Sequence, residues 1–105
     1  MRKRSLRFGC ALGAIATLAA TSSFAADADH GKTVAKRWCA SCHLIERDQK
    51  SATDQAPAFA AVARMPDFDE KKLAFFLLEP HPKMPNMALS RAEVADLADY
   101  IATLK

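Results

Sequence analysis

The chain has 105 residues, 50% of them hydrophobic and 26% charged, with a formal net charge of +3 and no internal repeat. This length limits it to one small domain. Residues 1–25 hold four of its fifteen cations and none of its twelve acids, so the remainder has eleven cations against twelve acids. That balance argues against a nucleic-acid-binding domain, which needs a basic surface.

Residues 1–25 have the three parts of a secretory signal peptide. A basic start is followed by an apolar stretch at 8–20, and Ser23-Phe24-Ala25 fits a small-x-small cleavage site. An uncleaved membrane anchor is the alternative, but the apolar stretch is shorter than the roughly 20 residues that span a bilayer. We therefore expect a leader at 1–25, export to the periplasm, and a folded domain at 26–105.

The first predicted helix runs from about His30 to Cys42, with Asp29 as its N-cap. Four residues share one side of it at helical spacing: Val34, Ala35, Trp38 and Cys42. Periodicity then stops over 44–55, where charged and small polar residues predict a loop. The pattern thus places the two cysteines of the domain at the end of a helix.

Two further helices are predicted before a proline-rich loop. A short one covers 58–64, with Phe59 and Val62 directed inward. The next begins at Asp67, with Glu70 completing a capping box, and its apolar face is formed by Leu73, Phe76 and Leu77. Pro80 ends it, and the three prolines of 80–86 predict a stiff, extended loop.

The last helix has the clearest start signal, a capping box formed by Ser90 and Glu93. Its apolar residues recur at helical spacing: Val94, Leu97, Ala98, Ile101 and Leu104. No stretch alternates with the period of a strand. The sequence therefore predicts an all-α fold of three or four short helices.

Residues 38–43 read Trp-Cys-Ala-Ser-Cys-His and contain C-x-x-C-H, the attachment signature of c-type haem. Two thiols one helical turn apart can add to the two vinyl groups along one porphyrin edge, and the adjacent imidazole then lies under the iron. We therefore predict one covalent haem c, with its iron, held by Cys39, Cys42 and His43. A large apolar cofactor would also brace a domain too small for a strong core of its own.

Two other kinds of site share the C-x-x-C spacing. A redox-active dithiol is expected to open a helix after a strand, whereas this pair closes a helix in a chain without a predicted sheet. Structural zinc needs four nitrogen or sulfur ligands, and the domain offers two cysteines and three scattered histidines. Haem therefore remains the prediction.

An electron-transfer haem normally has a sixth ligand, and a methionine thioether there raises the reduction potential relative to an imidazole. The domain offers three candidates: Met65, Met84 and Met87. Met84 lies between Pro82 and Pro85, so the stiff loop would present its sulfur at a fixed point. We predict Met84 as the sixth ligand.

The other donors stay as alternatives to Met84. Met87 is the main competitor because it follows only three residues later. Met65 precedes a helix start and is expected to pack in the core, as most methionines do. Ligation by two histidines would use His81 or His30 instead.

The domain resembles the class I cytochromes c, particularly the small bacterial members, over essentially all of 26–105. Gly31 stands eight residues before Cys39, where the family has a glycine that lets the first and last helices cross closely. Residues 96–101 resemble the family's final-helix pattern, in which a leucine and an aromatic residue pack against the helix that carries this glycine. The resemblance implies the cytochrome c fold, built around one covalently attached haem.

The resemblance also assigns residues around the iron. Pro57, fourteen residues after His43, looks like the family's proline whose carbonyl accepts a hydrogen bond from Nδ1 of the axial imidazole. Lys83-Met84-Pro85-Asn86 matches the family's distal methionine loop. His43 and Met84 are thus the implied metal ligands, with Pro57 supporting His43.

Two features depart from the family pattern. Ala35 stands where the family often has an aromatic residue, so Trp38 or Tyr100 is expected to fill that space. The usual aromatic partner of a haem propionate has no counterpart, and Arg64 and Asn86 are the candidate substitutes.

The resemblance implies a periplasmic electron carrier, not an enzyme, whose iron cycles between Fe(II) and Fe(III). Its expected partners are redox proteins that dock briefly at the exposed haem edge, with Lys32, Lys36, Lys83 and Arg91 as candidate steering charges. We expect a monomer or a transient complex, with no nucleic acid, and contact with a membrane only through partners or an uncleaved leader.

Two other functions stay open. One is a haem subunit or dedicated electron acceptor of a periplasmic oxidoreductase, for example a sulfur-compound or alcohol dehydrogenase. The other is a ligand-binding or peroxidase-like haem protein, which requires an open sixth position. The loop around Met84 argues against this last function.

Overall fold

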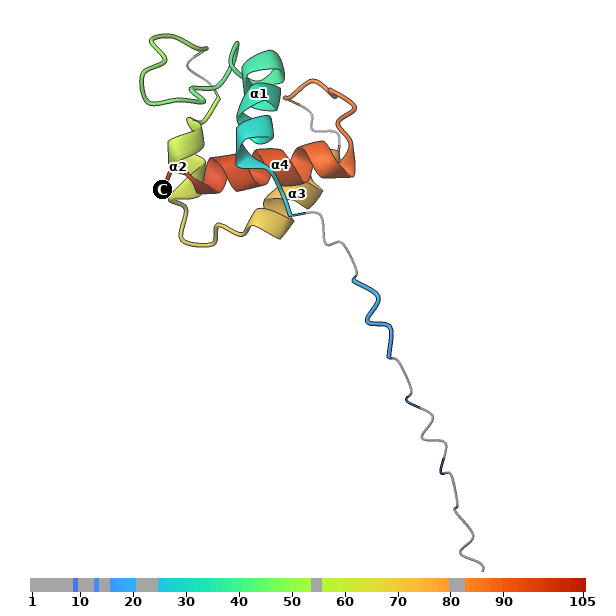
Figure 1. Cartoon of the computed structure of the whole chain (residues 1–105). Helices are drawn as coiled ribbons and strands as arrows, with labels where there is room; N and C mark the ends of the chain where they lie inside the picture. Colours follow the sequence, from blue (N-terminus) through green and yellow to red (C-terminus); the bar gives the residue numbers. More distant parts are fainter. Residues whose placement is uncertain (1–8, 10–12, 14–15, 21–24, 54–55, 80–82) are drawn as a thin grey trace, which may run out of the picture.

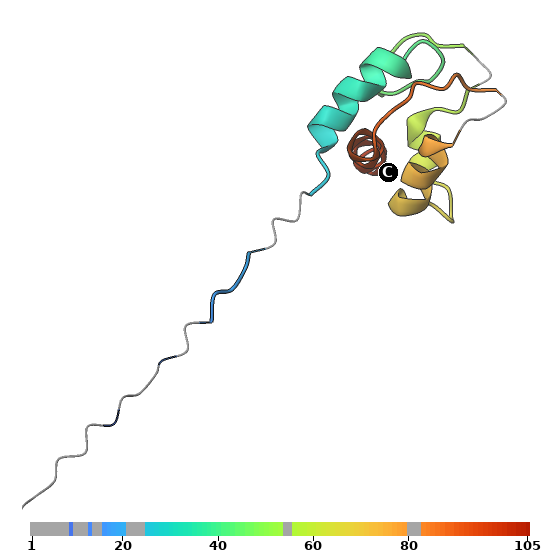
Figure 2. The same cartoon turned by 90° about the vertical axis from the view of Figure 1, so that its right-hand side faces the viewer.

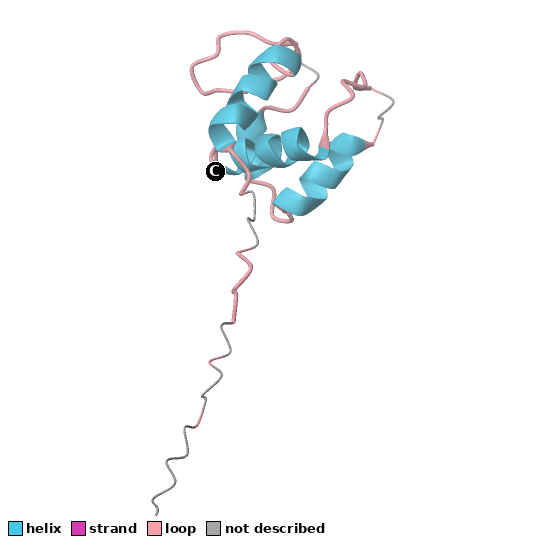
Figure 3. Cartoon of the chain, turned by 45° about the vertical axis from the view of Figure 1, so that its right-hand side comes forward, coloured by secondary structure: helices cyan, strands magenta, loops and turns pink. Residues whose placement is uncertain are grey.

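The computed structural model of the chain describes residues 9, 13, 16–20, 25–53, 56–79 and 83–105. Within these ranges it contains four helices and no strand, which confirms the all-α prediction (Figures 1 and 3). The helices are α1 (Ala28–Trp38), α2 (Phe59–Ala63), α3 (Glu70–Leu78) and α4 (Arg91–Ala102). The predicted leader falls largely outside the described residues, and none of the helices found is long and apolar enough to cross a membrane.

Helix α1 begins two residues earlier than predicted. Its N-cap is Asp27, not Asp29, and the Asp27 carboxylate accepts hydrogen bonds from the backbone N–H groups of Asp29 (3.0 Å) and His30 (3.1 Å). The helix also ends earlier, at Trp38, with Cys39 as its C-cap. Cys42 therefore lies beyond the helix, in a turn of its own.

Helix α4 forms the centre of the fold. Figure 2 views it nearly end-on, with α1 on one side and α2 and α3 on the other. Gly31 on α1 is buried against the backbone of Asp96 on α4, and a Cβ at this glycine would overlap the Asp96 carbonyl. The close crossing expected at Gly31 is therefore present, and any larger residue there would force the helices apart.

The capping box predicted for α4 is confirmed. Ser90 Oγ accepts from the Glu93 N–H at 3.1 Å, and Glu93 Oε2 accepts from the Ser90 N–H at 2.7 Å. The apolar stripe that follows is buried as expected: Val94, Leu97, Ala98 and Ile101. Leu104, beyond the end of the helix, is partly buried.

The start predicted for α3 is wrong. Its N-cap is Asp69, whose carboxylate accepts from the Lys72 N–H at 2.8 Å, so Asp67 and Glu70 do not form a capping box. The helix ends at Leu78, and Glu79, the residue before a proline, is extended. Pro80, His81 and Pro82 of the predicted stiff loop lie outside the described residues.

The core gathers side chains from α1, α2, α4 and the loop after α1, around Val34, Ala35, Ile45, Phe59 and Leu97. Tyr100 belongs to this core, and its hydroxyl donates to the Ile45 carbonyl at 2.7 Å. Trp38 is 42% exposed. Of the two aromatics expected to fill the space beside Ala35, Tyr100 is thus the one in the core.

Candidate cofactor site

The C-x-x-C-H residues form a turn that continues from the C-terminal end of α1. Cys39 and Ala40 both donate their N–H groups to the Ala35 carbonyl, at 2.8 and 3.1 Å. Cys42 and His43 in turn donate theirs to the Cys39 carbonyl, at 3.1 and 2.8 Å. These bonds fold the segment back on itself, so both thiols and the imidazole project from a single turn of chain.

The two cysteines do not form a disulfide and lie in different surroundings. Cys39 is buried, and burial, followed by the nearby Cys42, raises the pKa of its thiol to about 11. Cys42 is exposed, with the Ser41 hydroxyl 3.7 Å from its sulfur. The two cysteines of the turn thus differ in exposure, Cys39 being buried and Cys42 accessible to solvent.

The His43 imidazole is held by the backbone carbonyl of Pro57, 2.6 Å from Nδ1. A carbonyl only accepts hydrogen bonds, so Nδ1 is the donor, and in the neutral imidazole Nε2 then has its lone pair available for a metal. The Phe59 N–H donates to the Leu44 carbonyl at 2.9 Å, and the Phe59 ring lies 5.2 Å from the imidazole, centre to centre. The segment that carries Pro57 is therefore attached directly beside His43.

Gln49 was missed by the sequence reasoning, although its side chain makes four hydrogen bonds around this turn. Its side-chain amide donates to the carbonyls of Ala40 (2.9 Å), His43 (2.9 Å) and Ser51 (3.1 Å), and its oxygen accepts from the Ile45 N–H (2.9 Å). A glutamine in a polar loop carries no distinguishing pattern in sequence. Its importance comes from the fold of the loop around it.

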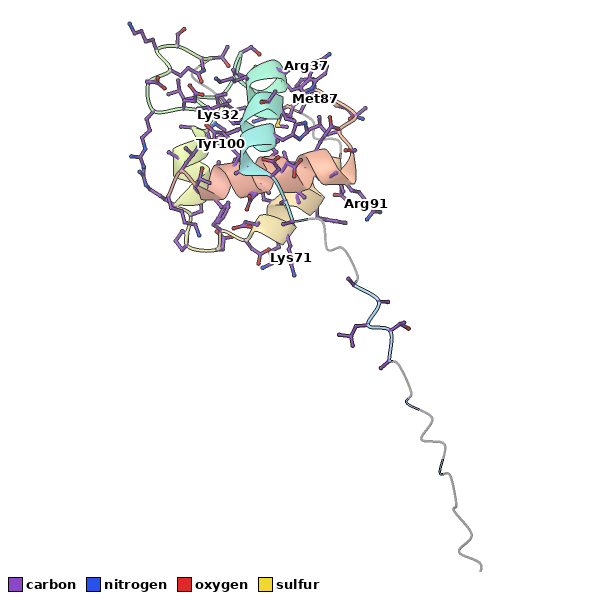
Figure 4. All side chains as sticks on the ribbon, in the orientation of Figure 1. Lys32, Arg37, Lys71, Met87, Arg91 and Tyr100 are labelled. Carbon is purple, nitrogen blue, oxygen red and sulfur yellow. The ribbon has the colours of Figure 1, made fainter. Side chains whose placement is uncertain are left out.

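The segment 83–90, which carries the candidate methionines, lies on the same side of α4 as the attachment turn (Figures 1 and 3). Met84 and Met87 are both partly buried, and in the view of Figure 4 Met87 lies above α4. The Asn86 side chain accepts from the Ala88 N–H at 2.9 Å, and Ala88 has a φ of 51°. A local turn therefore follows Met84 and shapes the loop around Met87.

The remaining candidates for the sixth ligand are Met65, His30 and His81. Met65 is 47% exposed and is not part of the core, contrary to the expected packing. His30 lies at the other end of α1 from the attachment turn, bonded to Asp96 at 2.7 Å. His81 lies outside the described residues, and within the described ones no three His, Cys, Asp or Glu side chains could hold a metal ion together.

Most candidate steering charges lie on or next to the helices, and two of them are already paired. Lys32 and Lys36 on α1 contact Glu46 at 3.0 and 3.4 Å, and the bond with Lys32 is the main cause that lowers the pKa of Glu46. Arg91 stands at the start of α4, apart from Lys32 (Figure 4). The two lysines of α1 therefore do not form an unopposed basic patch.

Comparison with known proteins gives two matches. A family model described as cytochrome c oxidase, cbb3-type, subunit III matches residues 26–101. Cytochrome c-552 of Bradyrhizobium diazoefficiens is 54% identical over 100 residues, which cover 95% of this chain and 95% of that protein. No solved structure was found to match the chain.

Proposed function

This chain belongs to the family of cytochrome c oxidase, cbb3-type, subunit III, and from that premise we propose that it carries electrons in the periplasm through a haem ligated by His43 and Met84. Membership makes it a small monohaem c-type cytochrome with covalently bound haem c and iron. It is an electron-transfer protein, not an enzyme, and its partners are redox proteins. The ligands, the attachment residues and the compartment are the parts proposed here.

The donor set of the attachment turn fits this cofactor. Cys39 and Cys42 do not form a disulfide, so both are available to form thioethers with the two vinyl groups. His43 has its Nδ1 engaged by Pro57, which leaves Nε2 as an iron ligand of fixed orientation. When bound, the haem iron supplies a one-electron Fe(II)/Fe(III) couple.

The observation that carries the proposal is the 2.6 Å contact between His43 Nδ1 and the Pro57 carbonyl. An axial imidazole uses such a bond to fix its tautomer and raise its basicity, and this imidazole closes the C-x-x-C-H turn. Met84 then completes the ligand set from the loop on the same side of α4. A thioether opposite an imidazole favours Fe(II) and so gives a positive reduction potential.

Export through a leader at 1–25 is the second part of the proposal. The family model begins to match at residue 26, which is where the sequence places the start of the folded domain. The match to cytochrome c-552 covers 95% of the chain and therefore extends into the leader region. The boundary of the family model supports a domain that begins at 26, preceded by the proposed leader.

The mass of the protein purified from the periplasm tests attachment and export together. We expect the mass of 26–105 plus one haem, and a Cys39→Ala, Cys42→Ala variant that carries no haem. A full-length mass without haem would contradict both parts of the proposal.

The sixth ligand is tested with Met84→Ala and its matched control Met87→Ala. The oxidised wild type should show the weak band near the red edge of the visible spectrum that marks methionine–iron ligation. We expect this band to vanish in Met84→Ala and to remain in Met87→Ala; the reverse pattern would assign Met87. Binding of carbon monoxide to the reduced native protein would contradict a closed sixth position.

A second candidate function is that of a haem subunit or dedicated electron acceptor of a periplasmic oxidoreductase. It is favoured by the description of the matching family model as an oxidase subunit. Gel filtration of a gentle periplasmic extract separates the two functions. A free carrier elutes at the size of a small monomer, whereas a subunit elutes with its enzyme.

A further inference from the structure

Gln49 makes contacts that reach both ends of the haem-attachment turn. Its amide nitrogen lies 2.9 Å from the Ala40 carbonyl, which precedes Cys42, and 2.9 Å from the carbonyl of His43 itself. The same nitrogen lies 3.1 Å from the Ser51 carbonyl. Three carbonyls separated along the chain thus converge on one side-chain amide, with two N–H donors shared among them.

The orientation of this amide is fixed by chemistry. The Ile45 backbone N–H only donates, so the side-chain oxygen of Gln49 must face it, at 2.9 Å. The three carbonyls only accept, so the NH₂ group must face them. Neither a carboxylate nor an apolar side chain of the same shape can satisfy both sides.

The loop that Gln49 closes is anchored on its other side by Tyr100. Ile45 is almost completely buried, and its carbonyl accepts from the Tyr100 hydroxyl at 2.7 Å. Gln49 therefore links the attachment turn to the backbone of Ile45, and the Tyr100 hydroxyl links that same residue to α4. The His43 backbone is thus held at its N–H by the Cys39 carbonyl and at its carbonyl by Gln49, while its ring is held by Pro57.

We propose that Gln49 is a positioning residue for the axial histidine: it holds the His43 main chain so that Nδ1 stays on the Pro57 carbonyl and Nε2 stays directed at the iron. This inference rests on the proposed role of His43 as an iron ligand. Without Gln49, the imidazole would lose part of its bond to Pro57 and become less basic, and Fe(III) would be stabilised less.

The test compares Gln49→Met, which keeps the side-chain length and removes all four hydrogen bonds, with Tyr100→Phe, which weakens the same loop from the α4 side. Both holoproteins should melt at lower temperature than the wild type. Only Gln49→Met should also raise the reduction potential and change the spread of the haem-methyl NMR signals, which reports the orientation of the axial imidazole. The band of methionine–iron ligation should remain in both variants.

Equal potentials and equal methyl patterns in the two variants would overturn the role of Gln49 and leave His43 ligation intact. If the wild type itself lacks the spectrum of a histidine-ligated low-spin haem, the proposed function fails first and this inference fails with it.

If Gln49→Met does not incorporate haem, the role of Gln49 can still be tested on the wild-type holoprotein. Slow solvent exchange of the Gln49 amide protons and their scalar couplings to the Ala40 and His43 carbonyls are expected, and fast exchange without couplings would overturn the proposal.

Discussion

At the scale of single residues, a hydrogen-bonded pair, His30 and Asp96, joins α1 to α4 beside their crossing. Asp96 accepts from the Asp27 N–H at 2.7 Å and bonds the His30 imidazole at 2.7 Å. The hydrogen bond with Asp96 is the largest cause that raises the pKa of His30, with Asp27 and Glu93 adding to it through their charges. The protonated imidazole is therefore favoured in the folded protein.

The stability of the holoprotein should consequently depend on pH through His30. A raised folded-state pKa means that the contribution is fully present below pH 6.5, the ordinary value for histidine, and is lost as the pH rises through the folded-state pKa. We expect the urea midpoint of the wild type to fall over this range relative to His30→Gln, which can bond Asp96 without titrating. Identical pH profiles for the two proteins would contradict this.

Single residues also show where sequence reasoning reached its limit in the site. Cys39, Cys42, His43 and Pro57 could be chosen because a motif or a fixed spacing marks them, and the structure contains the predicted His43–Pro57 contact. Gln49 could not be chosen, because its partners are backbone carbonyls that every residue has. The roles of these residues toward the haem remain predictions.

At the scale of helices, the apolar stripe of α4 was predicted correctly, those of α1 and α3 only in part, and two of the helix starts not at all. Trp38 and Phe76, expected on the apolar faces of α1 and α3, are 42% and 53% exposed. Asp27 caps α1 in place of Asp29 because its backbone is bonded to Asp96, 69 residues away, a contact that local periodicity does not contain. Asp69 caps α3 in place of Asp67 because Phe68 between them packs against the core. In both cases a tertiary contact that the local pattern does not contain accompanies the aspartate that caps the helix.

The start of α4 is different, because its two capping bonds are entirely local. Removing the hydroxyl in Ser90→Ala should destabilise the holoprotein by about 1 kcal/mol, the usual cost of losing an N-cap side chain. Glu93→Gln is the matched control, since an amide oxygen can still accept from the Ser90 N–H, and it should cost less. Guanidinium unfolding measures both, and a larger loss for Glu93→Gln would show that charge, not capping, stabilises this end.

At the scale of the whole molecule, the described part of the chain has a small core and much uncovered apolar surface. Its largest fully buried side chains are only Ile45, Val94 and Leu97. Phe75 and Phe76 on α3 are 65% and 53% exposed, and Trp38 beside the attachment turn is 42% exposed. Domains of this size usually need a disulfide, a metal or a cofactor to stabilise them, and in this family the covalent haem does so.

The Cys39→Ala, Cys42→Ala variant, which cannot attach haem, should therefore not fold cooperatively. We expect weak helical circular dichroism and a broad, featureless thermal profile, compared with the sharp transition of the wild-type holoprotein. A cooperative transition in the haem-free variant would mean that the polypeptide core is sufficient on its own.

The contact between Gly31 and the Asp96 backbone also fixes how α1 is rotated about its own axis. The helix runs from this contact to its C-cap at Cys39, and each α-helical residue turns the chain by about 100° and advances it by about 1.5 Å. One inserted or deleted residue between these two points would rotate the first thiol away from its present direction while the crossing stayed in place. A change of one residue in the length of 31–39 is therefore incompatible with the present site.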